Sequence, residues 1–457
     1  MIRLFNHYFS LRVLVLTLVE ALVLFQSLVV GFEIWTIGKA LPAPITQAVL
    51  FALVMLLMMT ALGLYEAYDE SFRVTLQRII VAYGLTLVTL SVVFYVFPQT
   101  YVQRGVFAVA SVFALAGEIL VRLFFFRVTA AGLPRRRVLV LGNGVEAEQV
   151  IRFLNEGARG RTIQYAGLYP VVAERDANGK TRTINHDHLL RTIRDLNVGE
   201  IVIAVREQRG GVLPLRQLLD AKLRGIQVID LATFYERELG MLYIDHIKAS
   251  WLIFGEGFSQ GLLRDVIKRV FDLFFGLLLL IVSLPVQLLA VLAILIDSGM
   301  PILYRQERVG QGGRAFTIVK FRTMVDDAEK DGTPRWAQQG DSRITRVGRF
   351  LRFTRIDELP QLFNVLRGDM SFVGPRPERP FFVRHLLEDI PFYDLRHSVK
   401  PGITGWSQVR YPYGASVGDS MQKLQYDLYY VKNHSLFLDL LILVDTVQVV
   451  LLGKGAR

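Results

Sequence analysis

Apolar residues are concentrated in four long segments near the start of the chain. These segments are Val13–Val30, Ile45–Leu64, Ile79–Phe97 and Gly105–Phe126. Each has about 18–22 residues, enough for a helix to cross a hydrocarbon layer of roughly 30 Å. The pattern therefore predicts an α-helical membrane domain of four spans over residues 1–130.

The positive charges between these segments predict their orientation. Several cations lie before the first segment, between the second and third, and after the fourth: Arg3, Arg12, Arg73, Arg78 and Arg135–Arg137. The other two connections hold one cation each, Lys39 and Arg104. By the positive-inside rule, both ends of the domain lie in the cytoplasm. We therefore expect everything after Arg135 to begin on the cytoplasmic side.

Three charged residues fall inside the predicted spans: Glu20, Glu118 and Arg122. Charges within a membrane can mark a transport path. Because Glu118 and Arg122 are four positions apart, they share one helix face. We interpret them as a paired or snorkelling couple.

Residues 131–255 predict a soluble, Rossmann-like α/β domain with a parallel sheet. Short apolar strands are expected at Val138–Leu141, Ile163–Leu168, Glu200–Val205 and Ile226–Leu231. A turn with Gly142 and Gly144 follows the first strand and is similar to a pyrophosphate-binding turn. However, the second strand does not end in the acid that would bind a ribose. We expect no NAD and assign no cofactor-binding residue, and we leave another ligand or a packing role for the turn open.

A fifth apolar segment, Val270–Ile296, has basic residues on both sides and a proline in its middle. Because both flanks are basic, both ends are expected on the cytoplasmic side. Pro285 interrupts a helix, and Ser283 is placed to satisfy a freed backbone group. We therefore expect residues 266–297 to form a re-entrant helix–break–helix, with a kinked fifth span as the alternative.

Composition narrows the functional classes. The chain of 457 residues is 52% hydrophobic with a net charge of +11, and its mean hydropathy is +0.37. In so apolar a chain, the basic excess favours a membrane surface or phosphorylated substrates, and no basic run interleaved with aromatic residues indicates nucleic acid. The absence of cysteine excludes disulfides, thiolate nucleophiles and cysteine-ligated metals.

The candidate chemistry lies in a third domain, residues 256–457. Asp357 and Glu358 are adjacent, so their side chains point in different directions and each can take a separate role. One carboxylate can attack phosphorus while the other holds a divalent metal. Cations that converge on such a pair indicate an anionic substrate such as a diphosphate. The candidate cations are Lys320 and Arg322, which a strand would place on one face, Arg352, and Arg376 in a Gly-Pro-Arg-Pro loop.

From about Arg264 onward, a series of ordered motifs resembles the monotopic phosphoglycosyl transferases, also called bacterial sugar transferases. The motifs are Tyr304–Gly310, Phe316–Met324, Asp341–Arg349, Asp357–Gln361, Asn364–Ser371, Pro401–Trp406 and Tyr426–Tyr430. The resemblance implies a monotopic α/β catalytic domain with a re-entrant membrane helix. The preceding spans and α/β unit resemble the long, polyprenyl glycosylphosphotransferase branch. Tyr411–Ser416 is similar to the branch associated with exopolysaccharide and exosortase systems.

This resemblance implies a two-step reaction. Asp357 would attack the β-phosphorus of a UDP-sugar and expel UMP, and undecaprenyl phosphate would then take the hexose-1-phosphate from the aspartyl intermediate. Glu358 would bind Mg²⁺, and Arg376 would hold phosphate. Further phosphate contacts are expected from Lys320, Arg322 and Arg352. The implied location is the bacterial inner membrane with the catalytic domain on the cytoplasmic face, and the implied task is the first membrane step of exopolysaccharide or related glycan synthesis.

Other functions stay open at this point. A lipid phosphatase or nucleotide-sugar pyrophosphatase would use the same carboxylate pair with water as the acceptor. A catalytically silent scaffold that senses a nucleotide predicts a broken Asp-Glu pair or a missing Pro-Arg-Pro loop, and both are intact here. The sugar and the oligomeric state, including a homodimer, are also left open.

Overall fold

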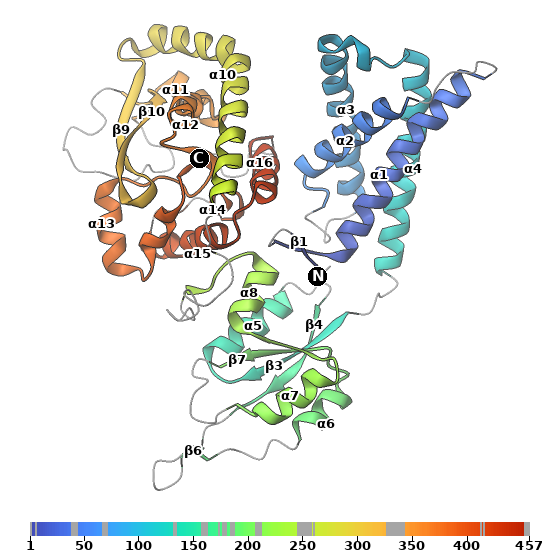
Figure 1. Ribbon diagram of the computed structural model, residues 1–457, viewed down its shortest axis with the longest axis vertical. Coiled ribbons are helices and arrows are strands. Elements are labelled where there is room, and N and C mark those ends of the chain that lie inside the picture. Colours follow the sequence, from blue (N-terminus) through green and yellow to red (C-terminus); the bar gives the residue numbers. More distant parts are fainter. Residues whose placement is uncertain are drawn as a thin grey trace. The chain divides into compact units, whose positions relative to one another are not determined.

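The computed structural model describes the chain except residues 1, 5–6, 38–43, 66–71, 131–134, 157–162, 172–173, 176–180, 183–187, 206–212, 245–257, 259–260, 326–342, 412–413, 415 and 452–457. Parts of two motifs, Asp341–Arg349 and Tyr411–Ser416, therefore lie outside the described residues. The chain forms two compact units (Figure 1). One is Phe9–Leu239, and the other joins Met1–Tyr8 to Gly240–Arg457.

The first unit begins with the expected apolar helices. They are α1 (Leu11–Trp35), α2 (Ile45–Ala61), α3 (Phe72–Val96) and α4 (Arg104–Ala130), with a short η1 (Pro98–Thr100) before α4. Of the described helices, α1, α3, α4 and α10 (Leu262–Ser298) are long and apolar enough to cross a membrane, and α2 is shorter at 17 residues. The expected second segment ran to Leu64, but the helix stops at Ala61 because Gly63 adopts a left-handed conformation with φ 71°.

Helices α1 and α4 pack closely through glycine. A Cβ atom on Gly31 would lie 2.7 Å from the backbone nitrogen of Ala110, and one on Gly117 would lie 2.5 Å from Cγ1 of Val23. Small residues allow such approach between membrane helices. The sequence predicted a couple of Glu118 and Arg122 within α4. In the structure Arg122 instead forms an ion pair with Glu20 of α1, at 2.5 Å.

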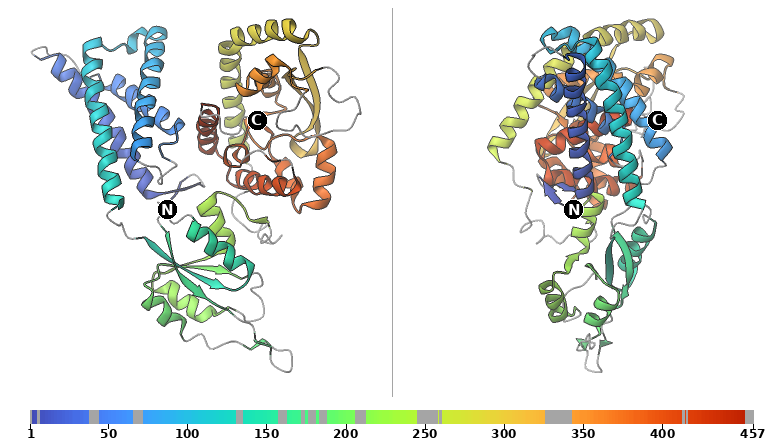
Figure 2. Two further views of the ribbon diagram at one scale, coloured as in Figure 1. Left: turned by 180° about the vertical axis from the view of Figure 1, so that it is seen from behind. Right: turned by 90° about the vertical axis from the view of Figure 1, so that its right-hand side faces the viewer.

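The α/β part has the expected parallel sheet, with strand order β4-β3-β7-β8. The strands are β3 (Arg136–Gly142), β4 (Ile163–Tyr169), β7 (Glu200–Ala204) and β8 (Gln227–Asp230), and a separate antiparallel pair is formed by β5 (Glu174–Arg175) and β6 (Thr181–Arg182). The helices are α5 (Val145–Glu156), α6 (Leu189–Asp195), α7 (Leu215–Leu223) and α8 (Leu231–Leu239). Helices α5 and α8 cover one face of the sheet, and α6 and α7 cover the other (Figures 1 and 2). All four predicted strands are confirmed.

The glycine turn after β3 has a packing explanation. A Cβ atom on Gly142 would lie 2.2 Å from the carbonyl oxygen of Ala204 on the neighbouring strand β7. Only glycine therefore allows the two strands to come this close. This contact accounts for Gly142 without a bound nucleotide.

The second unit is a compact α/β structure around buried aromatic residues, among them Tyr393, Trp406, Tyr429 and Tyr430. Its strands form an antiparallel pair, β9 (Leu303–Val309) and β10 (Ala315–Phe321), and a parallel pair, β11 (Ser371–Val373) and β12 (Gly402–Thr404). Its helical segments after α10 are η3 (Gln311–Gly313), α11 (Arg346–Phe353), η4 (Ile356–Gln361), α12 (Leu362–Arg367), α13 (Pro380–Asp389), η5 (Tyr393–Ser398), α14 (Trp406–Arg410), α15 (Val417–Asn433) and α16 (Leu436–Leu451).

Helix α10 contains the fifth apolar segment. It is assigned as one helix through Pro285 rather than as two separate helices, and its ribbon turns a corner along its length (Figures 1 and 2). The Ser283 hydroxyl contacts the carbonyl oxygen of Leu280 at 3.4 Å and accepts a hydrogen bond from Gln287 at 2.9 Å. Pro285 removes the donor to the carbonyl oxygen of Ile281, which is a different group from the one that Ser283 contacts. The predicted role of Ser283 in satisfying the freed group therefore stays a prediction.

The first residues of the chain pack on this second unit. They include β1 (Ile2–Leu4) and β2 (His7–Phe9). The His7 ring lies edge-on to Trp406 and Tyr429, and its Nδ1 is 2.7 Å from the Tyr429 hydroxyl. Trp406 also donates a hydrogen bond from Nε1 to the carbonyl oxygen of Gly240, at 2.7 Å. We call residues 2–4, 7 and 8 the N-terminal arm.

Strands β11 and β12 explain two glycine motifs. A Cβ atom on Gly402 would lie 2.1 Å from the backbone nitrogen of Gly374, and one on Gly374 would lie 2.2 Å from the carbonyl oxygen of Lys400. We expect Gly402→Ala to separate these segments and to destabilise the unit by about 1–3 kcal/mol, as overpacking does. Thermal unfolding of the purified protein would show a lower midpoint. Gly261→Ala is the matched control, because a Cβ atom there has no neighbour within 4 Å; equal midpoints for both variants would contradict the prediction.

Attachment of the N-terminal arm should depend on pH. Burial, and then the charge of Arg410, lowers the pKa of His7 from 6.5 to about 4. Protonation is thus less favourable in the attached arm than in a free one, and the attachment weakens as pH falls from 6.5 towards 4. Hydrogen exchange of the arm, corrected for the intrinsic effect of pH, should rise over this range. In His7→Asn the exchange should lose this pH dependence, and an unchanged profile would count against the assignment.

Candidate active site

The carboxylate pair lies in a short helical segment that follows a strained turn. Arg355 adopts a left-handed conformation with φ 59°, which is uncommon for a residue other than glycine. The chain then enters η4, where Asp357 is 8% and Glu358 is 9% exposed. Unusual backbone of this kind is found frequently at functional sites.

Glu358 is held by cations from two other segments. Its Oε1 lies 2.8 Å from Nζ of Lys320 on β10 and 3.6 Å from Nη1 of Arg376. Burial alone would raise the pKa of Glu358, but these cations lower it to about 2. Glu358 is therefore ionised throughout the physiological range.

Asp357 has a different environment. Its Oδ1 is buried and has no hydrogen-bond partner among the described residues. Burial, followed by the charge of Glu358, raises the pKa of Asp357 to about 6. Lys320, Arg352 and Arg355 oppose this rise. At neutral pH Asp357 is thus mostly ionised but poorly satisfied, as a nucleophile should be.

Three of the four predicted phosphate-binding cations lie around this pair. Lys320 and Arg376 contact Glu358, and Arg352 acts electrostatically on Asp357 while its Nε donates to Thr323 Oγ1 at 2.8 Å. Arg322 directly follows β10, which ends at Phe321, and its side-chain contacts lie away from the acidic pair.

Arg322 instead binds the end of α10. Its guanidinium donates to the carbonyl oxygens of Ser298, Gly299 and Met300 at 2.6, 2.7 and 3.0 Å. Cations are favourable at helix C-termini, where carbonyl groups lack partners. A phosphate contact by Arg322 stays a prediction, and its contacts here indicate a structural role.

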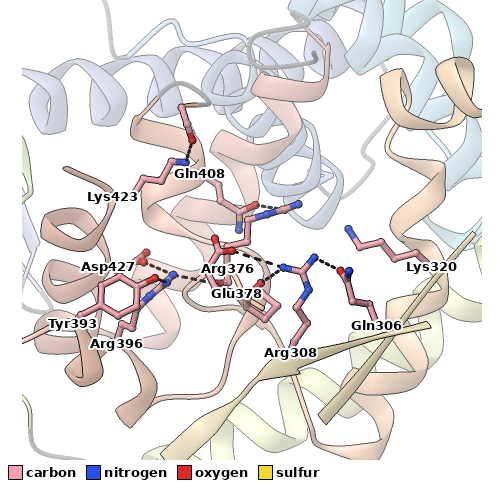
Figure 3. A network of polar contacts seen from close by, with 12 residues as sticks. Gln306, Arg308, Lys320, Arg376, Glu378, Tyr393, Arg396, Gln408, Lys423 and Asp427 are labelled. Atoms are coloured by element: carbon pink, nitrogen blue, oxygen red, sulfur yellow. Dashed lines mark hydrogen bonds and ion pairs between the residues drawn. The ribbon is translucent and has the colours of Figure 1, made fainter. Parts of the chain in front are cut away.

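Two further arginines, which the sequence did not single out as site residues, fix the loop that carries Arg376 (Figure 3). Arg396 of η5 donates to the carbonyl oxygen of Arg376 at 2.9 Å, and Arg308 of β9 donates to that of Pro377 at 3.0 Å. Arg396 is itself held by Asp427 at 2.8 Å and by the Tyr393 hydroxyl. The backbone of the loop is therefore held on two sides, while the Arg376 side chain stays 35% exposed.

The sequence pointed to some of these additional residues but not to others. Arg308 lies in the Tyr304–Gly310 motif, and Arg355 lies two positions before Asp357, so both could be found beside motifs. Arg396 had no such signal, because it meets Asp427 only through folding. The partners of a buried guanidinium cannot be derived from local spacing.

The acidic pair offers oxygen donors of the kind that a divalent cation takes. A magnesium ion commonly takes one or two protein carboxylates and completes its shell with water and phosphate oxygens. The unpartnered Oδ1 of Asp357 and the ionised Glu358 provide such donors. Among the described residues there is no group of three or more side chains able to hold a metal without substrate.

Comparisons with known proteins agree with this site. The bacterial sugar transferase family matches residues 263–453, which include α10, the acidic pair and the Arg376 loop. A UDP-N-acetylgalactosamine-undecaprenyl-phosphate N-acetylgalactosaminephosphotransferase of Aeromonas hydrophila is 36% identical over 406 residues, 86% of this chain and 90% of that protein. An undecaprenyl-phosphate glucose phosphotransferase of Komagataeibacter xylinus is 33% identical over 70% of this chain and 60% of its own.

A third relative shows the same extended similarity. The UDP-glucose:undecaprenyl-phosphate glucose-1-phosphate transferase of Xanthomonas campestris pv. campestris is 30% identical over 75% of this chain and 72% of its own. All three matches are much longer than residues 263–453 and therefore extend beyond the catalytic segment. The chain therefore belongs to the bacterial sugar transferase family, the polyprenyl phosphoglycosyl transferases, and is a membrane enzyme of the family's long form.

Proposed function

We propose that this enzyme transfers a hexose-1-phosphate from a UDP-sugar to undecaprenyl phosphate through a phosphosugar intermediate on Asp357. The observation that carries the proposal is the unequal acidic pair. Glu358 is bound by Lys320 and Arg376, whereas Asp357 keeps a buried oxygen without a partner. The names of the relatives supply the two substrate classes.

In the first step a carboxylate oxygen of Asp357 bonds to the β-phosphorus of the UDP-sugar. The bond from that phosphorus to the bridging oxygen breaks, and UMP leaves with the electron pair. In the second step a phosphate oxygen of undecaprenyl phosphate attacks the same phosphorus. The bond to Asp357 breaks, which restores the carboxylate and gives a diphosphate-linked lipid sugar.

The surrounding cations suit the charge of these substrates. Lys320, Arg352 and Arg376 would hold phosphate oxygens and stabilise charge on the leaving group. Glu358 would be the main ligand of Mg²⁺, which when bound would neutralise part of the diphosphate charge. The three cations exceed the two carboxylates in number, which favours the binding of an anion.

We further propose that α10 is re-entrant and sets the site at the membrane surface. Its first half is tied to the unit by Lys268, which pairs with Asp439 at 2.6 Å, and by Asp272, which accepts a hydrogen bond from Ser371 at 2.9 Å. Its end is tied to the same unit by Arg322. The stretch between is largely exposed and apolar. A helix that returns to one soluble unit at both ends supports entry and exit on one face, which we assign to the cytoplasmic side from the charge pattern.

The covalent step can be tested with the purified enzyme, Mg²⁺ and a panel of UDP-sugars that contains glucose and N-acetylgalactosamine donors, without lipid. We expect a protein mass adduct of one sugar phosphate on Asp357 and its loss in Asp357→Asn. Lipid-linked product should fall by roughly 10³-fold or more, because the nucleophile is gone. Asp389→Asn, at an exposed position on α13, is the matched control and should keep both signals.

The acceptor distinguishes this proposal from hydrolysis. Lipid-linked product without any adduct would exclude the aspartyl intermediate and favour direct transfer. Release of sugar phosphate to water with no lipid product would support a phosphatase or pyrophosphatase instead. The donor that labels Asp357 would identify the sugar.

The metal assignment makes a separate prediction. Removal of divalent cations with a chelator should abolish transfer, and added Mg²⁺ should restore it. In Glu358→Gln we expect a strongly reduced rate and a higher Mg²⁺ concentration for half-maximal rate, because a charged ligand is lost. Glu388→Gln, an exposed position on α13, is the control. An unchanged Mg²⁺ dependence in Glu358→Gln would remove Glu358 from the metal site.

A further inference from the structure

The bundle of α1 to α4 contains a second acidic pair that plays no part in the proposed reaction. Glu20 of α1 and Glu118 of α4 are both fully buried. Each lies inside a helix long and apolar enough to cross a membrane. Ionisable groups in such a position are costly and are found mainly where they serve a function.

Both carboxyl oxygens of Glu20 lie close to Arg122. Its two oxygens face Nε and Nη2 of Arg122 at 2.5 and 3.2 Å, and Oε2 also accepts a hydrogen bond from the Tyr65 hydroxyl at 2.5 Å. Arg122 places its remaining nitrogen, Nη1, 2.8 Å from the carbonyl oxygen of Leu64. Glu20 and Arg122 therefore neutralise each other.

Glu118 has no such compensation. Neither carboxyl oxygen has a hydrogen-bond partner among the described residues, although the group faces Glu20. The titratable and charged groups around it are Glu20, Arg122 and Tyr65, and Tyr83 of α3, whose hydroxyl donates to the carbonyl oxygen of Ser111. The one cation of this set is already used by Glu20. An ionised Glu118 would add an uncompensated negative charge to an apolar interior.

We infer that Glu118 binds a proton and donates a hydrogen bond to Glu20, which makes the α1–α4 interface a proton-binding site. One proton brings the set of two carboxyl groups and one guanidinium to zero charge. Two carboxyl groups that share a site commonly hold one proton between them for this reason. The close contacts at Gly31 and Gly117 place α1 and α4 against each other, so loss of the proton would set like charges directly within the interface. Among the described residues no group of three or more ligands is available for a divalent metal.

The test uses the full chain in phospholipid nanodiscs and infrared difference spectra between the wild type and Glu118→Gln. The wild type should show the C=O stretch of a protonated carboxyl group at neutral pH, and Glu118→Gln should lack it. Glu33→Gln, an exposed position on α1, is the matched control and should keep the band. The proposal would be overturned if Glu118→Gln lost the band of an ionised carboxylate and not the C=O band of a protonated carboxyl group. If that carboxylate band also shifts when K⁺ is replaced by choline, the site binds a monovalent cation instead.

A second measurement tests whether loss of the proton loosens the packing of α1 against α4. The chain has no cysteine, so spin labels can be placed at the exposed positions Leu22 of α1 and Leu120 of α4. In the protein with Glu118, the distance distribution between them should broaden as the pH is raised. In the Glu118→Gln background it should stay narrow, since glutamine imitates the protonated acid. An identical response in both backgrounds would contradict the inference.

Discussion

A charge buried in a protein interior must be met by an opposite charge, and this requirement connects the distant segments of the enzyme. Lys268 ties α10 to α16 through Asp439, Arg396 ties η5 to α15 through Asp427, and Glu20 ties α1 to α4 through Arg122. Each of these pairs is largely buried, so loss of one partner would leave the other without compensation. The ion pairs thus join elements that are far apart in the sequence.

The active site departs from this balance. Its two carboxylates are surrounded by more cations than they can neutralise, and one of their oxygens has no partner among the described residues. The backbone contacts of Arg308 and Arg396 hold the Arg376 loop in place before substrate arrives. Such preorganisation lowers the cost of arranging charges during the reaction.

The sequence was informative wherever a single element decides the outcome. The length of the apolar segments predicted the membrane helices, and the alternation of strands and helices predicted the parallel sheet. The adjacent acids Asp357 and Glu358 and the loop with Arg376 were both identified as candidate site residues. It was uninformative where distant segments meet. Arg322 binds the end of α10, and Arg122 pairs with Glu20, 102 positions away, rather than with the nearby Glu118. Local spacing favours a partner four positions away, but helix packing brought a better one.

The N-terminal arm has a consequence for how the catalytic unit is made and handled. His7 is synthesised 422 positions before its partner Tyr429, so this part of the unit can only close once almost the whole chain has been translated. Contacts between such distant positions slow folding, because a long loop must first be closed. The unit is also discontinuous along the gene. A fragment that begins at Gly240 would lack the arm and would leave the surfaces of Trp406 and Tyr429 that it covers open to solvent.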